Sequence, residues 1–260
     1  MSLHRLAAVL LMCLAASSLQ AQEVGQVVDL DRGAWVTSTS GKSRLQPGAR
    51  ISMKDVIETD GAGRAQFVFD DGTKIAVGPR SKLVIDEILM RSGTRASRFA
   101  VNAVSGSMRF ITGKSPKSAY SITTPTATMG IRGTAFEVSM KRRDSTDLVL
   151  FSGILTVCTA AGCQRVSNAC QAVTATSFGK ILETRDEGQK GQLISRNFPL
   201  IVRQASLRPD FQLPLERCGD RVSRIVERAA VGTPPERPDR ETPVAPSPPP
   251  PPPPPPPHPI

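Results

Sequence analysis

Residues 65–77, AQFVFDDGTKIAV, hold the clearest structural signal in the chain. Two runs of alternating side chains meet at Asp71-Gly72. Alternation places every second side chain on the same face of a strand, and Asp-Gly is a preferred two-residue hairpin turn because both residues tolerate positive φ. The stretch therefore predicts a β-hairpin. Its expected core-facing positions are Phe67, Phe69, Ile75 and Val77.

The adjacent carboxylates Asp70 and Asp71 could be interpreted as a catalytic acid–base pair. Neighbouring strand positions point to opposite faces of a sheet, so these two groups would not converge on one substrate. We therefore interpret Asp71 and Gly72 as the turn of the hairpin and assign neither aspartate a catalytic role.

Similar segments rich in Val, Ile, Phe and Thr follow one another from Glu23 to about Ser177. Turn signals such as Pro47-Gly48 and Ser152-Gly153 separate them, and no long helical period lies between them. Short strands at this spacing predict an all-β domain over residues 22–178.

A weak internal repeat indicates how these strands are arranged. Gly33, Gly106 and Gly153 each precede an alternating strand that is followed by a turn and another strand. This pattern predicts stacked short antiparallel strands and hairpins, arranged either as a sandwich or as a short β-solenoid. The repeat is too degenerate to choose between the two.

The composition changes after the β region. Residues 179–230 carry more charge, with helix-like stretches separated by prolines, and predict a small, partly helical extension. Residues 231–260 hold 16 of the 23 prolines, including ten in a row at Pro248–Pro257. Such a segment cannot form a packed core, so we expect a disordered tail with polyproline II character that acts as a spacer or as a ligand for an aromatic groove.

The first 21 residues have the pattern of a secretory signal peptide. A short basic start precedes the apolar run Leu6–Ala16, and a small polar stretch ends at Ala21. The run is too short to span a bilayer, which takes about 20 residues, and no later stretch is as apolar. We expect cleavage after Ala21, export, and no transmembrane segment in the mature chain.

After cleavage four cysteines remain, an even number in an exported chain, which favours disulfides. Cys158 and Cys163 flank the four-residue turn Thr-Ala-Ala-Gly, which could bring opposed hairpin positions close together. The preferred pairing is Cys158–Cys163 and Cys170–Cys218, with the second bond tying the extension to the β domain.

The composition excludes several kinds of chemistry. The only two histidines, His4 and His258, lie in the leader and the tail, so the expected folded part has no histidine base, no histidine-dependent nucleophile and no histidine metal ligand. We expect no enzyme activity, no cofactor and no metal site. An enzyme that uses carboxylates alone is a third class of function, but no sequence feature places two acids in one cleft.

The net charge of +10 at pH 7 points to an anionic partner or surface. The excess is scattered among acidic residues instead of forming one block, so we do not expect nucleic-acid binding. The one local concentration is Lys141-Arg142-Arg143. This patch is the predicted contact for an anion or an acidic partner, unless it is simply a solvated loop.

Five stretches in order resemble the FecR domain of bacterial periplasmic proteins. They are GQVV at 25–28, RGAWV at 32–36, LQPGARI at 45–51, DVIETDGAGRAQFVFDDGTKIAVGPRS at 55–81, and YSITTPTATMGIRGTAFEV at 120–138. The fourth is similar to the family's strand, Asp-Gly, strand pattern, and the fifth to its Thr-Pro and Gly-Thr-x-Phe-x-Val signature.

The matching motif residues have the character of a scaffold. Gly130 and Gly133 would permit tight corners, Thr134 would bond to backbone at a corner, and Phe136 and Val138 would face the core. The full set of expected structural motif residues is Asp71, Gly72, Thr124, Pro125, Gly133, Thr134 and Phe136.

The resemblance implies a binding or signalling module without catalytic residues. The best-known family members relay a signal through a transmembrane helix, and that role does not transfer to a chain whose cleavable leader directly precedes the domain. We expect an exported, periplasmic interaction or scaffold module that binds an envelope protein, such as an outer-membrane transducer or receptor. The alternative is an electrostatic binder of anionic envelope polymers, either lipopolysaccharide or wall glycan.

Overall fold

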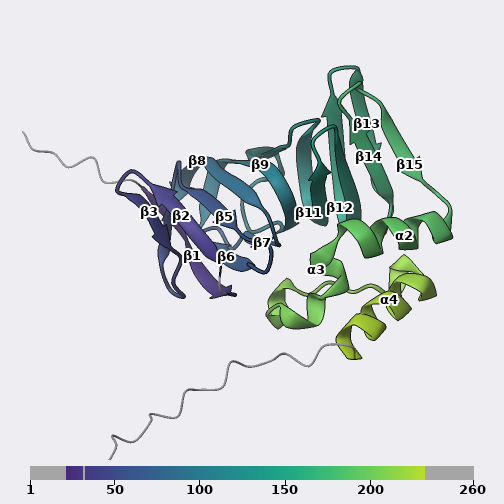
Figure 1. Ribbon diagram of the computed structural model, residues 1–260. Coiled ribbons are helices and arrows are strands. Elements are labelled where there is room, and N and C mark those ends of the chain that lie inside the picture. The colour runs from purple at the N-terminus through teal and green to yellow at the C-terminus, as the bar shows by residue number, and fades with distance from the viewer. Residues whose placement is uncertain (1–21, 32, 232–260) are drawn as a thin grey trace, which may run out of the picture.

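The structure, a computed structural model, describes residues 22–31 and 33–231 (Figure 1). The predicted signal peptide and most of the predicted proline-rich tail lie outside the described residues. Within them, fifteen strands form one hydrogen-bonded sheet. The strands are β1 (Glu23–Leu30), β2 (Ala34–Ser38), β3 (Gly41–Arg44), β4 (Arg50–Ser52), β5 (Val56–Thr59), β6 (Ala65–Phe69), β7 (Lys74–Val77), β8 (Lys82–Ser92), β9 (Arg95–Ile111), β10 (Tyr120–Thr123), β11 (Thr128–Arg142), β12 (Ser145–Thr159), β13 (Gly162–Val166), β14 (Ala172–Thr176) and β15 (Ile181–Thr184).

Three long strands connect the parts of this sheet because each bends at a glycine. Gly106 in β9, Gly133 in β11 and Gly153 in β12 have φ of +81°, +64° and +84°, a region that side chains strongly disfavour. Beyond each bend the strand changes some of its partners. The first half of β9 pairs with β8 and, in parallel, with β10, whereas its second half pairs with β7 and β11.

The bends explain the weak glycine repeat. Gly33, Gly106 and Gly153 all have positive φ: Gly33 lies in the turn before β2, whereas Gly106 and Gly153 lie at bends inside β9 and β12. The result is the predicted all-β architecture, with strands stacked from the purple end of the chain to the green end (Figure 1). Two features differ from the expectation of short antiparallel strands: β9 is 17 residues long, and the β9–β10 pair is parallel.

One continuous core runs through the sheet from β1 to β14. The predicted core positions are all at most 2% exposed: Phe67, Phe69, Ile75, Val77, Phe136 and Val138. An aromatic cluster lies at the centre, where the Phe99 ring centroid is 5.0 Å from that of Phe69 and 6.0 Å from that of Phe110 in edge-on contacts. Edge-to-face packing of this kind adds about 1 kcal/mol per pair beyond the burial of apolar area.

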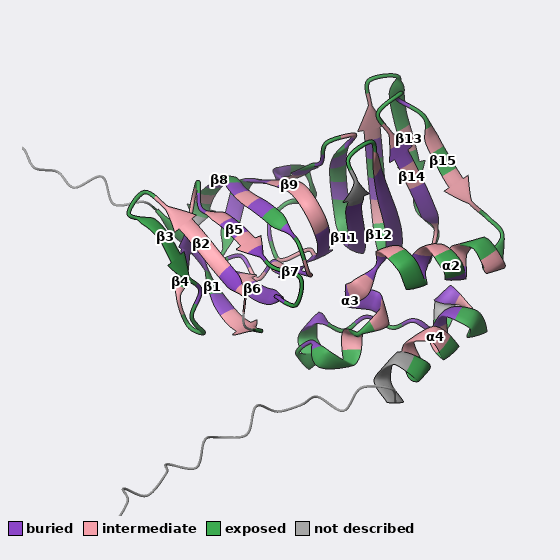
Figure 2. Ribbon diagram, viewed as in Figure 1, coloured by how far each residue is buried: buried purple, intermediate pink, exposed green. Residues whose placement is uncertain are grey.

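The C-terminal part packs against the outer face of the sheet. Its helices are α2 (Glu187–Asn197), α3 (Pro199–Val202) and α4 (Asp220–Val231), with short 3-10 turns η2 (Gln204–Ser206), η3 (Pro209–Phe211) and η4 (Glu216–Cys218) between them. A further 3-10 turn, η1 (Lys117–Ala119), precedes β10. Figure 2 shows buried positions on the helices where they face the sheet. The sheet itself continues past residue 178, because β15 pairs with β14.

Two apolar contacts hold this extension to the sheet. Phe198 and Ile201 pack with Val149 and Phe151 in one cluster, and Leu207 and Phe211 join Ala76 in another. Each fully buried side chain of this size contributes about 2 kcal/mol. The helices are therefore part of the folded unit and not an appendage.

Candidate functional site

The hairpin turn lies where it was predicted, between β6 and β7, but Gly72 has positive φ and Asp71 does not. The Asp71 side chain also does more than form a turn. Gly72 has φ +82°, while the Asp71 carboxylate is buried and accepts hydrogen bonds from Ser115 Oγ at 2.6 Å, Tyr120 Oη at 2.8 Å and Thr73 N at 2.9 Å. Burial raises the pKa of Tyr120, so its hydroxyl keeps the proton that it donates. Asp71 is therefore a structural hub that ties the hairpin to the chain before β10.

Asp70 bonds outside that network, from the turn that follows β6. Its carboxylate accepts hydrogen bonds from Arg50 Nη2 at 3.1 Å on the surface. The two aspartates do not converge, and no acid–base pair exists at this hairpin.

The Thr124-Pro125 motif closes the turn between β10 and β11. Thr124 Oγ1 donates to the Ala127 carbonyl at 2.9 Å and accepts from the Ala127 N–H at 3.1 Å. Thr146 Oγ1 donates to the same hydroxyl at 3.0 Å. The motif thus connects β12 to the turn, and Pro125 is exposed beside it.

The Gly-Thr-x-Phe signature fits its predicted role with two corrections. Gly133 forms the corner, with φ +64°, whereas Gly130 has no positive φ and lies in the regular part of β11. The Thr134 hydroxyl is buried without a hydrogen-bond partner among the described residues. Thr112 Oγ1 instead holds the Thr134 backbone, donating to its carbonyl and accepting from its N–H, both at 2.8 Å.

Both predicted disulfides are present. Cys158–Cys163 joins opposed positions of the β12–β13 hairpin, with a Cα–Cα distance of 4.0 Å. Cys170–Cys218 connects the loop before β14 to η4, with a Cα–Cα distance of 5.0 Å. The second bond fastens the helical extension to the sheet, as the sequence predicts.

A buried ion pair, which the sequence analysis did not identify, lies under the helical extension. Arg109 on β9 and Glu137 on β11 are register partners with fully buried side chains, and Arg109 Nη2 is 2.9 Å from Glu137 Oε2. Arg109 Nη1 also donates to the Phe211 carbonyl at 3.0 Å, and the Leu200 N–H donates to Glu137 Oε1 at 3.2 Å. Burial raises the pKa of Glu137, against the opposing effect of the Arg109 charge.

The ion pair holds the extension and offers no reaction site, because the segment that it binds also covers it. The sequence signal was weak. Glu137 is the second variable position of the Gly-Thr-x-Phe-x-Val motif, and Arg109 precedes it by 28 residues. Only strand pairing brings them together.

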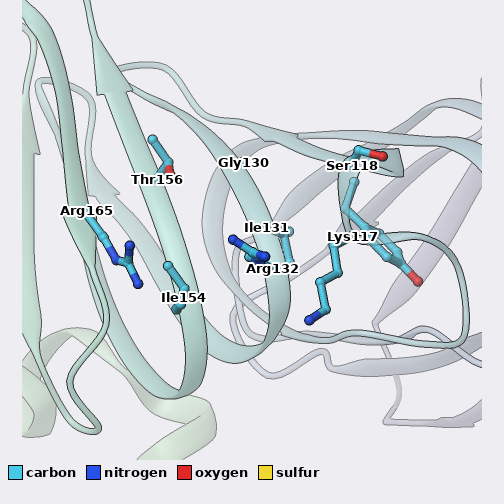
Figure 3. Close-up of a pocket in the computed structure, with 9 residues that line it drawn as sticks. Lys117, Ser118, Gly130, Ile131, Arg132, Ile154, Thr156 and Arg165 are labelled. Carbon is cyan, nitrogen blue, oxygen red and sulfur yellow. The ribbon is translucent and has the colours of Figure 1, made fainter.

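A basic groove lies on the exposed face of β10–β13 (Figure 3). It has a volume of about 630 Å³. Its three charged side chains are all cationic: Lys117 from η1, Arg132 from β11 and Arg165 from β13. Ser118, Tyr120, Gly130, Ile131, Ile154 and Thr156 complete the lining.

Strand register explains this gathering of charge. Arg132 is opposite Ile154 across β11–β12, and Arg165 is opposite Thr156 across β12–β13. Positions 154 and 156 share a face of β12 because side chains alternate along a strand. The sequence analysis missed the groove because its three cations are far apart in the chain.

The predicted patch Lys141-Arg142-Arg143 lies at the other end of β11, where the strand turns into β12. Arg143 is exposed, and the side chains of the other two lie outside the described set. The structure does not join this patch to the groove, and its role stays a prediction.

The described residues lack two features, a metal-binding cluster and a membrane-spanning helix. No group of three or more His, Cys, Asp or Glu side chains in the described part of the chain could hold a metal ion. Across residues 22–31 and 33–231, no helix is long and apolar enough to cross a membrane.

Part of the chain is similar to a known protein family. Residues 55–156 match the family model described as FecR protein. No curated protein matches the chain. Two crystal structures of a protein from Parabacteroides distasonis, described as an anti-sigma factor, are similar to 53% and 54% of this chain, at 16% and 17% identity and TM-scores of 0.42 and 0.41. The matched regions cover 64% and 63% of those two chains, less than two thirds of their length.

Proposed function

We propose that this chain, whose residues 55–156 match the FecR protein family model, is a non-enzymatic interaction or scaffold module of the periplasm that binds another envelope protein. The family match is the observation that carries the proposal. Export rests on the leader-like residues 1–21.

The surroundings of the acidic side chains support a non-enzymatic role. Asp71 and Glu137 are buried in structural networks. Asp70 and Glu58 are ion-paired at the surface with basic neighbours. General acid–base catalysis needs a titratable group that can reach a substrate, and neither buried acid has that access.

The free edge of the sheet is the best place for a protein partner. β15 ends the strand order and, among the described residues, pairs with β14 alone. Phe178, in the turn before it, is 86% exposed, and Leu182 is 54% exposed. An unpaired strand edge with apolar side chains beside it can accept a strand or an apolar segment of another protein.

In-cell crosslinking of the tagged protein, followed by mass spectrometry, tests this proposal. Three forms are compared: the full chain, a chain that ends at Ala230, and Phe178→Ser/Leu182→Ser. We expect one envelope protein to be captured by the first two and its yield to fall about tenfold for the third, since losing two buried apolar contacts weakens binding at least that much.

Other results would change or contradict the assignment. Capture that disappears on truncation at Ala230 would move the function to the tail. The absence of any specific partner from all three forms would contradict an interaction module.

A second candidate function is binding of anionic envelope polymers, and the basic groove favours it. The net charge of +10 adds long-range attraction for such polymers. Retention on purified envelope material should fall steeply as salt rises from about 0.05 M to about 0.5 M, because exposed charges are screened over shorter distances. Salt-independent retention would contradict this function.

A further inference from the structure

Gly130 lies at the floor of the basic groove for no structural reason within the described residues. It occupies the interior of β11, between Ser121 of β10 and Thr156 of β12, and its φ is not positive. A Cβ at this position would meet only Thr156 Cβ, at 4.0 Å. Glycine inside a strand costs about 0.5–1 kcal/mol relative to alanine, so the chain loses stability here without relieving a clash.

The neighbouring glycines behave differently. Gly133 and Gly153 have positive φ, and a Cβ at Gly153 would lie 2.0 Å from the Gly133 carbonyl oxygen. Backbone conformation requires those two glycines. What Gly130 provides is open space between cationic side chains (Figure 3).

The three cations surround this space from separate elements. Arg132 and Arg165 are two strands apart, about 10 Å across the sheet and about 7 Å along it. Two side chains as long as arginine can reach one small ligand over this separation. Lys117 extends over Gly133, where its Cε would lie 3.8 Å from a Cβ. None of the three has an ion pair with another described residue, and the groove lining contains no Asp or Glu. Three unpaired like charges around one hollow repel one another unless an anion enters.

The lining defines the chemistry of that anion. Three cations without a counter-charge favour a dianion over a single carboxylate, and a phosphomonoester carries about −1.5 to −2 at pH 7. Arginine also forms bidentate bonds to phosphate. Beside the charges, Ser118 and Thr156 offer hydroxyl groups that can bond to the hydroxyls of a sugar, and the Ile154 side chain and the bare Gly130 backbone leave room for its ring.

We propose that this groove binds a phosphorylated sugar, with the phosphate held by Lys117, Arg132 and Arg165 and the ring over Gly130. The proposal rests on the second candidate function, anion binding, and specifies its site and ligand class.

Calorimetric titration of the purified protein tests the site, with glucose 1-phosphate as the probe, glucuronate as the carboxylate probe and glucose as the neutral probe. We expect saturable binding of glucose 1-phosphate, at least tenfold weaker binding of glucuronate and no binding of glucose. Arg132→Gln and Arg165→Gln should each weaken glucose 1-phosphate binding about tenfold, the usual effect of losing a charge-assisted hydrogen bond. The matched control is Arg203→Gln, which removes the same charge from an exposed position of the helical extension and should leave the affinity unchanged.

Gly130→Val separates the groove from general electrostatics. It alters no charge, places a branched side chain where the sugar ring would lie, and suits a strand. It should therefore abolish binding while the melting temperature stays the same or rises. Unchanged binding by Gly130→Val, or equal weakening by Arg203→Gln, would overturn the proposal. So would tighter binding of an acidic peptide such as hexaglutamate, which would make the groove a protein contact.

Two further comparisons distinguish a lipid-borne ligand from a soluble one, and failure of the groove proposal from failure of the second candidate function. If vesicles that carry a phosphorylated glycolipid bind the wild-type protein but not Gly130→Val, the ligand is a lipid-borne sugar phosphate. If only the free probe binds, the ligand is a soluble sugar phosphate. If wild type and Gly130→Val are retained equally on envelope material with the same salt dependence, polymer binding stands and the groove proposal fails. If neither is retained, the second candidate function fails as well.

Discussion

Asp70 and Asp71 are adjacent in the turn between β6 and β7, and their side chains have opposite surroundings. Asp71 is 1% exposed and accepts three hydrogen bonds. The Asp70 side chain is 31% exposed and bonds to Arg50 at the surface. The same chemical group is thus essential to the fold at one position and dispensable at the next.

Replacing each aspartate with alanine should show this difference. Asp71→Ala leaves the Ser115 and Tyr120 hydroxyls and the Thr73 N–H buried without their acceptor, so we expect a loss of about 3 kcal/mol in the free energy of unfolding. Asp70→Ala should cost less than about 1 kcal/mol, as for other surface ion pairs. Urea denaturation measures both, and equal losses would contradict the assignment of Asp71 as a hub.

Glycines show a similar contrast at the residue scale. Gly153→Ala would force a side chain into positive φ and against the Gly133 carbonyl, and we expect a loss of at least about 2 kcal/mol. Gly130→Ala should be neutral or stabilising by about 0.5 kcal/mol. Thermal unfolding of the two variants distinguishes a structural glycine from one that keeps the groove open, and a destabilised Gly130→Ala would contradict the latter.

At the scale of elements, side chains on the sheet hold the backbone of the extension. Arg109 and Glu137 bond to backbone groups of Phe211 and Leu200, and Gln66 accepts from the Arg208 N–H. These contacts do not depend on the side chains of the segment that they bind. They fix where the extension lies, while the apolar clusters supply most of the attraction.

Breaking one side of the buried ion pair should therefore be more harmful than replacing both. Glu137→Gln leaves the Arg109 charge uncompensated in the interior, and we expect a loss of about 3–5 kcal/mol. The double variant Arg109→Met/Glu137→Leu should lose less, because it buries no unpaired charge. Urea unfolding of the two variants gives the comparison, and a double variant less stable than the single would show that the backbone contacts matter more than the charge.

At the scale of the whole molecule, a covalent bond complements the packing of the extension. Cys170–Cys218 closes a loop across a sequence separation of 48, whereas Cys158–Cys163 spans only 5. A cross-link stabilises mainly by restricting the unfolded chain, and longer loops gain more. The two bonds therefore differ in what they do: one joins two parts of the fold, and the other closes a single hairpin.

Removing the disulfides one at a time should reproduce this order. From loop length, replacing Cys170 and Cys218 with alanine should cost about 4 kcal/mol, and replacing Cys158 and Cys163 about 2 kcal/mol. Chemical denaturation under non-reducing conditions measures both. The reverse order would mean that the apolar clusters alone hold the extension in place.

Much of the fold follows from local patterns. Alternation identified the hairpin at residues 65–77 and its buried positions, and the Gly33, Gly106 and Gly153 pattern marked one turn and two strand bends. Cysteine spacing predicted Cys158–Cys163, and the two remaining cysteines formed the second predicted pair. Such features depend on neighbours in the chain, where strand period and turn chemistry suffice.

Only the tertiary structure decided which distant residues meet. Gly130 was expected to form a corner, yet it floors an open groove, and the cations around it come from three elements. Arg109 and Glu137 likewise became partners through the register of β9 and β11. The physical reason is that bends at Gly106, Gly133 and Gly153 redirect long strands toward new partners, and no periodicity along the chain records which partner each strand will find.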